Sequence, residues 1–153
     1  QAVFFCNAAK IPELTLMTND QPNYLKIIDV PGDILTYGDL TLKFLVDENM
    51  ENYMIIHNWL TGLGFPETTQ QYKDLITNDE GLRDPKEAFS DGSLRILNNN
   101  YRDVAVVKFL DLYPVSLTSL EFDATITDVK YFTAEVSFKY TVYNILDKNN
   151  KRL

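Results

Sequence analysis

The sequence contains few of the residues that most catalytic and metal-binding sites need. Its 153 residues include one histidine, His57, and one cysteine, Cys6. A single cysteine excludes a disulfide within the chain and favours a reducing compartment. Cys6 and His57 alone cannot complete a closed zinc site, because such sites take four protein ligands. We therefore expect no metal and no cofactor.

The sequence also lacks the motifs of nucleophilic and nucleotide chemistry. It has no G-x-S-x-G elbow and no phosphate-binding P-loop. Gly62 and Gly64 follow an apolar stripe of helical period, so they indicate the end of a helix and not a dinucleotide fingerprint. His57 lies near that stripe without a partner motif, which favours a structural role over catalysis. We predict that the protein is not an enzyme.

Basic residues and long apolar runs are scarce as well. The 14 Lys and Arg residues are outnumbered by 22 Asp and Glu residues, which gives a net charge of −8. This balance argues against binding nucleic acid by neutralising phosphates. No apolar run approaches the roughly 20 residues that cross a bilayer, so we expect no membrane anchor. Apolar residues make up 45% of the chain, enough for one core, and we predict a single domain over residues 1–153.

The strongest positive signal is a regular alternation near the end of the chain. Every second residue from Phe132 to Val142 is apolar, and the residues between them are polar. Because side chains on a strand alternate between faces, residues 131–145 are predicted to form one long strand with a dry face and a wet face. A strand of this length suits the wall of an extended sheet. The expected core residues are Phe132, Val136, Phe138, Tyr140 and Val142, together with Trp59 and Leu60.

Shorter strands and turns are predicted earlier in the chain. Residues 3–8, 24–30 and 40–46 have strand patterns, with Leu25 and Ile27 expected to be buried. Residues 18–23 and the tripeptide Pro31-Gly32-Asp33 are predicted turns, because proline presets φ and glycine accepts positive φ. The chain opens at Gln1 without a methionine or a basic segment, and we expect that residues precede it in the full protein.

One substantial helix and one long polar segment are predicted in the middle. Apolar residues at three- and four-residue spacing indicate a helix from about residue 50 to 63. Residues 67–92 are predicted to be a polar surface loop or insertion, with a short helix around 70–76. Strands are expected again at 93–97 and 104–110. The last residues, 147–153, are predicted to be a frayed tail.

Four blocks of sequence carry a family resemblance when they are taken together. They are an aromatic strand that ends at a proline (4–12), a strand followed by a Gly-Asp turn (28–33), a strand that leads into the helix containing Trp59 (40–47), and Asp-Leu-Tyr-Pro (111–114) before the long closing strand. In this order and spacing, the chain resembles the tail tube proteins of contractile-tailed bacteriophages and the related baseplate tube initiators. Residues 67–92 have no counterpart motif.

The resemblance implies a mainly β fold, a β-sandwich or tube-type barrel domain with one flanking α-helix. In that family six copies close into a ring, the inner sheet of each copy joins its neighbours, and the rings stack into a tube. Closure pairs strand edges that a single copy leaves open. The implied function is that of a virion structural protein, whose tube conducts DNA during ejection. The implied location is the virion tail, after synthesis in the host cytoplasm.

The resemblance also implies partners and contact residues. The partners are further copies of the chain and the tail sheath, baseplate and tape-measure proteins, while DNA passes through without specific binding. An acidic wall would repel DNA, whereas Lys139 on such a wall would attract phosphate. The candidate lumen-facing residues are Thr133, Glu135, Ser137, Lys139 and Thr141. The candidate inter-subunit residues are Asn19, Asp20, Pro31, Gly32, Asp33, Asp79 and Glu80.

Three alternatives remain open from the sequence. The chain could be a tube initiator, a terminator or a baseplate hub paralogue with the same fold. It could form the tube of a contractile injection system or of a secretion system. A third alternative is a monomeric β-sandwich module that binds sugar or peptide, which would require a concave aromatic site and no oligomer.

Overall fold

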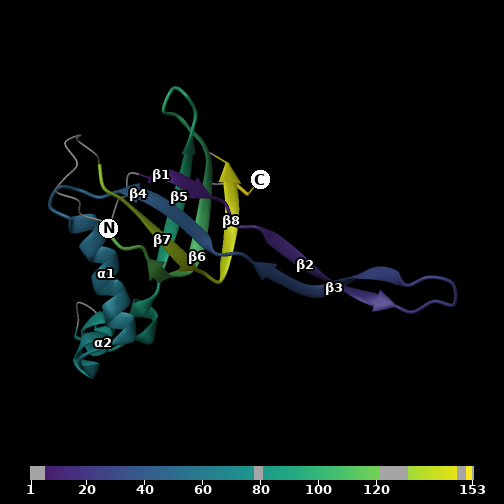
Figure 1. Ribbon diagram of the computed structural model, residues 1–153, viewed down its shortest axis with the longest axis horizontal. Helices are drawn as coiled ribbons and strands as arrows, with labels where there is room; N and C mark the ends of the chain where they lie inside the picture. Colours follow the sequence, from purple (N-terminus) through teal and green to yellow (C-terminus); the bar gives the residue numbers. More distant parts are fainter. Residues whose placement is uncertain (1–5, 78–80, 121–130, 148–150, 153) are drawn as a thin grey trace.

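The computed structural model describes residues 6–77, 81–120, 131–147 and 151–152. Figure 1 shows strands at the centre, helices on one side and a long hairpin that extends away from them on the other. The elements are β1 (Cys6–Lys10), β2 (Leu14–Gln21), β3 (Ile28–Tyr37), β4 (Leu40–Leu45), α1 (Glu51–Gly64), α2 (Thr69–Ile76), the short 3-10 helix η1 (Pro85–Ala88), β5 (Ser90–Leu97), β6 (Asp103–Leu117), β7 (Thr133–Lys139) and β8 (Val142–Asp147). The predicted mainly β fold is confirmed.

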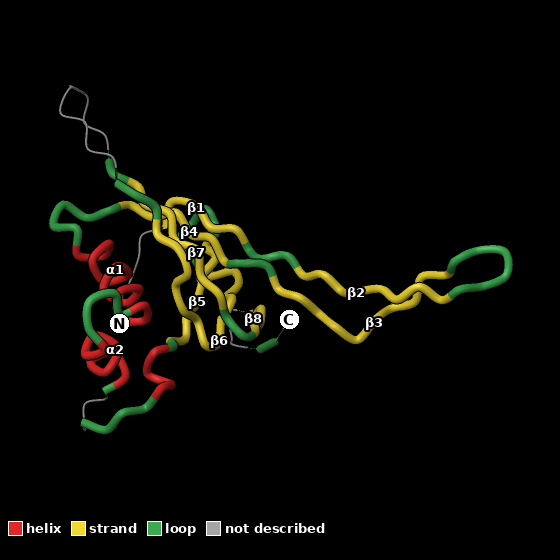
Figure 2. The backbone as a smooth tube through the Cα atoms, turned by 60° about the horizontal axis from the view of Figure 1, so that its bottom comes forward, coloured by secondary structure: helices red, strands yellow, loops and turns green. Residues whose placement is uncertain are grey.

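The main sheet is antiparallel and curls because β6 changes its partner halfway. The strand order is β1-β4-β7-β6-β5, and β8 pairs with β6 as well. The first half of β6 pairs with β8 and the second half with β7. Between the two halves, Asp111 has a φ of 54°, and its N–H donates to the carboxylate of Asp91 at 3.3 Å. This left-handed residue bends β6, and the sheet forms an open half-barrel (Figure 2).

The prediction of one unbroken strand over residues 131–145 is wrong. The segment forms β7 and β8, which are separated by Tyr140 and Thr141 opposite the bend of β6. The dry face is confirmed within β7, where Ala134, Val136 and Phe138 are buried. After the break the alternation changes phase, so Tyr140 and Tyr143 both pack against the core.

Helix α1 covers the open side of the half-barrel. Its bounds agree with the prediction, and Ile56 is fully buried against the core cluster that contains Phe44, Phe109 and Val136. The predicted core positions Trp59 and Leu60 pack there too, and the Trp59 indole donates to the carbonyl of Ala88 at 2.9 Å. A Cβ on Gly62 would lie 3.2 Å from a methyl group of Leu75, so this glycine lets α2 approach α1 closely.

Residues 67–92 contain more regular structure than the sequence indicated. Besides the expected short helix, found as α2, they hold η1 and the start of β5. Pro85 begins η1, and the Asp84 carboxylate accepts the Lys86 N–H at 2.9 Å. Asp79 and Glu80 lie outside the described residues. The expected tail at 147–153 begins inside β8, whose last residue is Asp147.

Strands β2 and β3 form a separate two-stranded sheet, which we call the arm (residues 14–37). Figures 1 and 2 show the arm projecting from the body. The predicted turn at residues 18–23 is wrong for residues 18–21, which continue β2, and right for residues 22 and 23, which lie in the hairpin loop. The predicted turn at Pro31-Gly32-Asp33 is wrong, because these residues lie inside β3. The register shifts between Leu16 and Thr18, so Gly32, Asp33 and Ile34 form a bulge, and Pro31 is the paired residue at its edge.

Candidate assembly interface

The half of the arm nearest the body has one apolar face, on which three leucines are about half exposed. Leu14 lies opposite Tyr37, and Leu16 lies opposite Leu35, so these four side chains share a face. The three leucines are 45–51% exposed. Next to the body, the opposite face carries Thr15 and Thr36, and the Thr36 hydroxyl donates to the carbonyl of Thr15 at 3.2 Å. Contiguous exposed apolar side chains of this kind mark a protein interface.

The outer half of the arm is acidic along its strands and apolar at its tip. Asp20 lies directly opposite Asp29, and like charges in this arrangement weaken a strand pair. At the tip, Tyr24 is 98% exposed and Leu25 is 92% exposed. The predicted burial of Leu25 and Ile27 is therefore wrong, because both side chains lie at the exposed end of the arm.

The arm brings together most of the predicted contact residues. Asn19 and Asp20 lie on β2, and Pro31, Gly32 and Asp33 lie on β3, so residues expected in two separate turns occupy one projecting structure. The exposed leucines were missed as contact residues. Their signal was present in the alternating pairs Leu14 and Leu16, and Leu35 and Tyr37.

Gly32 is required where β2 and β3 approach each other. A Cβ on this residue would lie 2.5 Å from the carbonyl oxygen of Met17. We expect Gly32→Ala to loosen the arm without unfolding the body, because the clash moves only β2 against β3. Hydrogen exchange should show faster exchange of β2 and β3 amides and unchanged protection in β6. Gly64→Ala is the control, since a Cβ there meets no atom within 4 Å. Unchanged arm protection in Gly32→Ala would contradict this expectation.

An aromatic cluster joins the arm to the body. Tyr37, the last residue of β3, has its ring 6.0 Å from Tyr140 and 5.7 Å from Tyr143, measured between centroids. Both of these rings also contact Phe109, at 5.0 and 5.7 Å. The Tyr140 hydroxyl donates to the carbonyl of Gly38 at 2.9 Å, and the Tyr143 hydroxyl donates to the carbonyl of Pro12 at 3.3 Å.

Tyr140 should make the attachment of the arm sensitive to alkaline pH. Burial, together with the neighbouring Tyr143, Tyr37 and Asp39, raises the pKa of Tyr140 to about 12. A raised pKa in the folded state favours the neutral hydroxyl, so its stabilisation is complete below about pH 10 and is lost as pH rises towards 12. Ultraviolet titration should show a late-ionising tyrosine that disappears in Tyr140→Phe and persists in the control Tyr101→Phe. If the late phase persisted in Tyr140→Phe, the late-ionising group would not be Tyr140.

The outward face of the main sheet is mostly polar along β7, apart from Leu45 opposite Thr133, and it holds four of the five candidate lumen residues. Cross-strand register places Thr133, Glu135, Ser137 and Lys139 of β7 on the face opposite the core residues. Glu135 and Lys139 are exposed, Thr133 and Ser137 are half-buried, and Thr141 is exposed in the break after β7.

The part of this face formed by β1, β4 and β7 carries more lysines than acids. Lys43 on β4 lies directly opposite Glu135, and Lys10 on β1 lies opposite Thr41, which pairs with Ser137. Residues opposite one another share a face. Lys10, Lys43 and Lys139 therefore outnumber Glu135 on this surface, although the whole chain is acidic.

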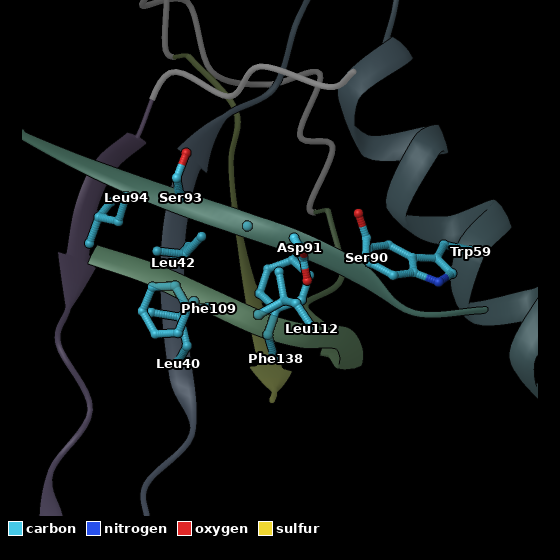
Figure 3. Close-up of a pocket in the computed structure, with 11 residues that line it drawn as sticks. Leu40, Leu42, Trp59, Ser90, Asp91, Ser93, Leu94, Phe109, Leu112 and Phe138 are labelled. Atoms are coloured by element: carbon cyan, nitrogen blue, oxygen red, sulfur yellow. The ribbon is translucent and has the colours of Figure 1, made fainter. Parts of the chain in front are cut away.

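A cavity of about 270 Å³ lies inside the half-barrel. Figure 3 shows Leu40, Leu42 and Phe109 grouped beside one another, with Trp59 on the α1 side. Leu40, Phe109 and Phe138 are all buried, so this side of the space is an incompletely filled part of the core, whereas the exposed residues Ser90, Asp91 and Ser93 line the other side. In the described part of the chain, no three His, Cys, Asp or Glu side chains are grouped to hold a metal ion. No helix within the described ranges is long and apolar enough to cross a membrane.

Comparisons with known proteins find similar folds among solved structures of contractile systems. Among solved structures, a chain of the anti-feeding prophage baseplate aligns with a TM-score of 0.57 and 12% identity, over 95% of this chain and 82% of that chain. A chain of the sheath-tube complex of the extracellular contractile injection system PVC aligns with a TM-score of 0.56 and 17% identity, over 93% and 80%. A chain of the PVC sheath/tube terminator aligns with a TM-score of 0.54 and 17% identity, over 92% and 84%.

At these identities the likeness establishes the fold alone. No curated protein sequence matches the chain significantly. The family model for phage tail tube proteins, however, matches residues 1–146, nearly the whole chain. The chain therefore belongs to the phage tail tube protein family.

Proposed function

We propose that this chain is the subunit of a tube, in which six copies close head to tail into a ring and the rings stack. The observation that carries the proposal is the projecting arm, whose leucines are about half exposed. A contact between the arm of one subunit and a different surface of the next subunit is heterologous. Repeated contacts of this kind close into a ring when the rotation that relates neighbouring copies returns to the first copy. The baseplate of the anti-feeding prophage, to which the chain is similar, was six-fold symmetrised.

Open strand edges support the same assembly. Within the described residues, β1 pairs only with β4, and β5 pairs only with β6. Unpaired edges add strands from other chains, and ring closure would pair them between neighbouring copies. In this arrangement the outward face of the main sheet lines the channel, with Thr133, Glu135, Ser137 and Lys139 facing the lumen and Thr141 at its rim. The residues that contact neighbouring copies are Asn19, Asp20, Pro31, Gly32, Asp33, Asp79 and Glu80.

The tube would serve as a conduit. In a virion tail it would conduct DNA during ejection. The sheath would surround the tube, the baseplate would lie at one end of it, and the tape-measure protein would occupy its channel before ejection. The lysines of the sheet face would touch passing phosphates, so transit without specific binding requires that these contacts stay few and weak. The similarity to chains of an injection system supports a second candidate, the tube of a contractile injection device. Assembled particles that contain no DNA would favour that candidate.

Electron microscopy of the purified protein tests the assembly. We expect six-fold rings and short tubes at high protein concentration. A chain that stays monomeric under all assembly conditions, and that forms no ring in the particle it comes from, would overturn the proposal.

Cysteine labelling tests which face lines the channel. In a Cys6→Ser background, Glu135→Cys should react with a small maleimide in monomers and tubes, but with a bulky polymer-linked maleimide in monomers only. Asn58→Cys, which is exposed on α1, serves as the control that reacts with both reagents. Reaction of Glu135→Cys with the bulky reagent in intact tubes would place this face outside.

A further inference from the structure

We propose that Tyr140 and Tyr143 are positioning residues for assembly, whose two hydroxyl groups hold the arm at a fixed angle to the body before a neighbouring copy binds. The clamping of the arm is argued from hydrogen bonds and ring contacts alone. The role of the clamp in assembly rests on the proposed function. We call these two residues the tyrosine clamp.

Only two short crossings connect the arm to the body. Residues 11–13 lead from β1 into β2, and Gly38 and Asp39 lead from β3 into β4. The Gly38 N–H donates to the carbonyl of Glu13 at 3.0 Å, so the crossings are bonded to each other. That bond closes the base of the hairpin but leaves its direction relative to the body undetermined.

The tyrosine clamp supplies the missing connection, with one hydrogen bond for each crossing. Tyr143 donates to Pro12, which precedes β2, and Tyr140 donates to Gly38, which follows β3. Both acceptors are backbone carbonyls, so the bonds restrain the main chain and not a mobile side chain. Two restraints on opposite strands of the hairpin resist a swing of the arm better than one.

The clamp is itself held rigid by the core. Phe109 is 1% exposed and contacts both tyrosine rings, while Tyr37 of the arm packs edge-on against the same two rings. Aromatic pairs in edge-to-face geometry have a preferred orientation. The rings of Tyr140 and Tyr143 therefore fix the orientation of Tyr37, and with it the orientation of the arm relative to the body.

The break between β7 and β8 makes this arrangement possible. In an unbroken strand, Tyr140 and Tyr143 would point to opposite faces because they are three residues apart. The bend at Asp111 and the break opposite it bring both side chains to the core side, next to the arm. The irregularity that interrupts the predicted long strand thus has a structural use.

A fixed arm lowers the cost of association. A subunit whose arm samples many directions must order it whenever a neighbour binds, and this entropy reduces affinity. A clamped arm presents its leucines in the bound direction from the start. We therefore expect loss of the clamp to raise the protein concentration needed for ring formation, on the order of tenfold.

The test compares Tyr140→Phe/Tyr143→Phe with a matched hydroxyl deletion elsewhere. Tyr53→Phe is the control, because its hydroxyl donates to the carbonyl of Thr118 at 3.3 Å, away from the arm. Spin labels at Lys26→Cys and Asn99→Cys, in a Cys6→Ser background, report the distance between arm tip and body in dilute monomers. The distance distribution should be narrow in the wild type and in Tyr53→Phe, and broad in the double variant. Sedimentation velocity then gives the concentration at which rings form.

Each outcome decides one part of the proposal. A narrow distribution in the double variant would refute the clamp. A broad distribution with an unchanged threshold for ring formation would refute its role in assembly. If the wild-type chain forms no rings, the proposed function fails while the distance measurement still decides the clamp. Should the double variant not fold, Tyr143→Phe alone is measured in the same way, with the same two refuting results.

Discussion

Replacement of Leu16 by aspartate is expected to abolish ring formation while the body stays folded. Leu16 lies on the apolar face of the arm, about half exposed, where a neighbouring copy is proposed to cover it. A carboxylate buried there without a partner costs roughly 3–5 kcal/mol, which corresponds to a loss of affinity of more than a hundredfold. The free monomer would not be destabilised in this way, because the introduced carboxylate faces water there.

Thr15→Asp provides the matched control for this experiment. Thr15 is the adjacent residue on β2 but belongs to the polar face of the arm. Sedimentation velocity should show rings for Thr15→Asp at concentrations near those of the wild type, and monomers alone for Leu16→Asp. Equal assembly of the two variants would mean that the apolar face is not the contact surface.

The second large effect is expected for Phe109→Ala, in the stability of the body. Phe109 is fully buried between the main sheet and the two tyrosines, and it borders the cavity inside the half-barrel. Truncation would enlarge a space that is already incompletely filled, and changes of this kind cost about 3–5 kcal/mol. Small domains have only about 5–15 kcal/mol of stability, so much of the total would be lost.

Chemical denaturation measures this loss directly. Phe65→Ala is the comparison, because Phe65 is exposed at the end of α1 and packs only against Tyr72 among the described aromatic rings. It should lower the free energy of unfolding far less than Phe109→Ala does. A loss below about 1 kcal/mol for Phe109→Ala would show that the cavity can collapse around the missing ring.

The features that the sequence predicted well all arise from local periodicity. The alternation of Ala134, Val136 and Phe138 directly reports the buried face of β7. Helix α1 was predictable because its apolar stripe and its final glycines lie within one short segment. The break after β7 was not predictable in this way. It depends on the left-handed backbone of Asp111, which lies on a different strand and carries no distinctive sequence signal.

The assembly surface was only half predictable for a related reason. Pro31, Gly32 and Asp33 carry the composition of a turn, but the same residues also suit a bulge in a two-stranded ribbon with open edges. The apolar character of Leu25 and Ile27 indicated burial, yet periodicity does not show whether a side chain is covered by its own chain or by another. The arm exposes residues whose cover, in the proposed tube, comes from a second copy.

The facing carboxylates of Asp20 and Asp29 have a consequence for the subunit before it assembles. A two-stranded ribbon with open edges and exposed leucines has properties of segments that aggregate edge to edge. Two arms that paired in this way would bring four carboxylates into one row, and their repulsion opposes the pairing. Pro31 adds to this protection because it has no N–H to offer an incoming strand. In the proposed tube, this acidic pair would therefore oppose edge-to-edge pairing of free subunits before they join a ring.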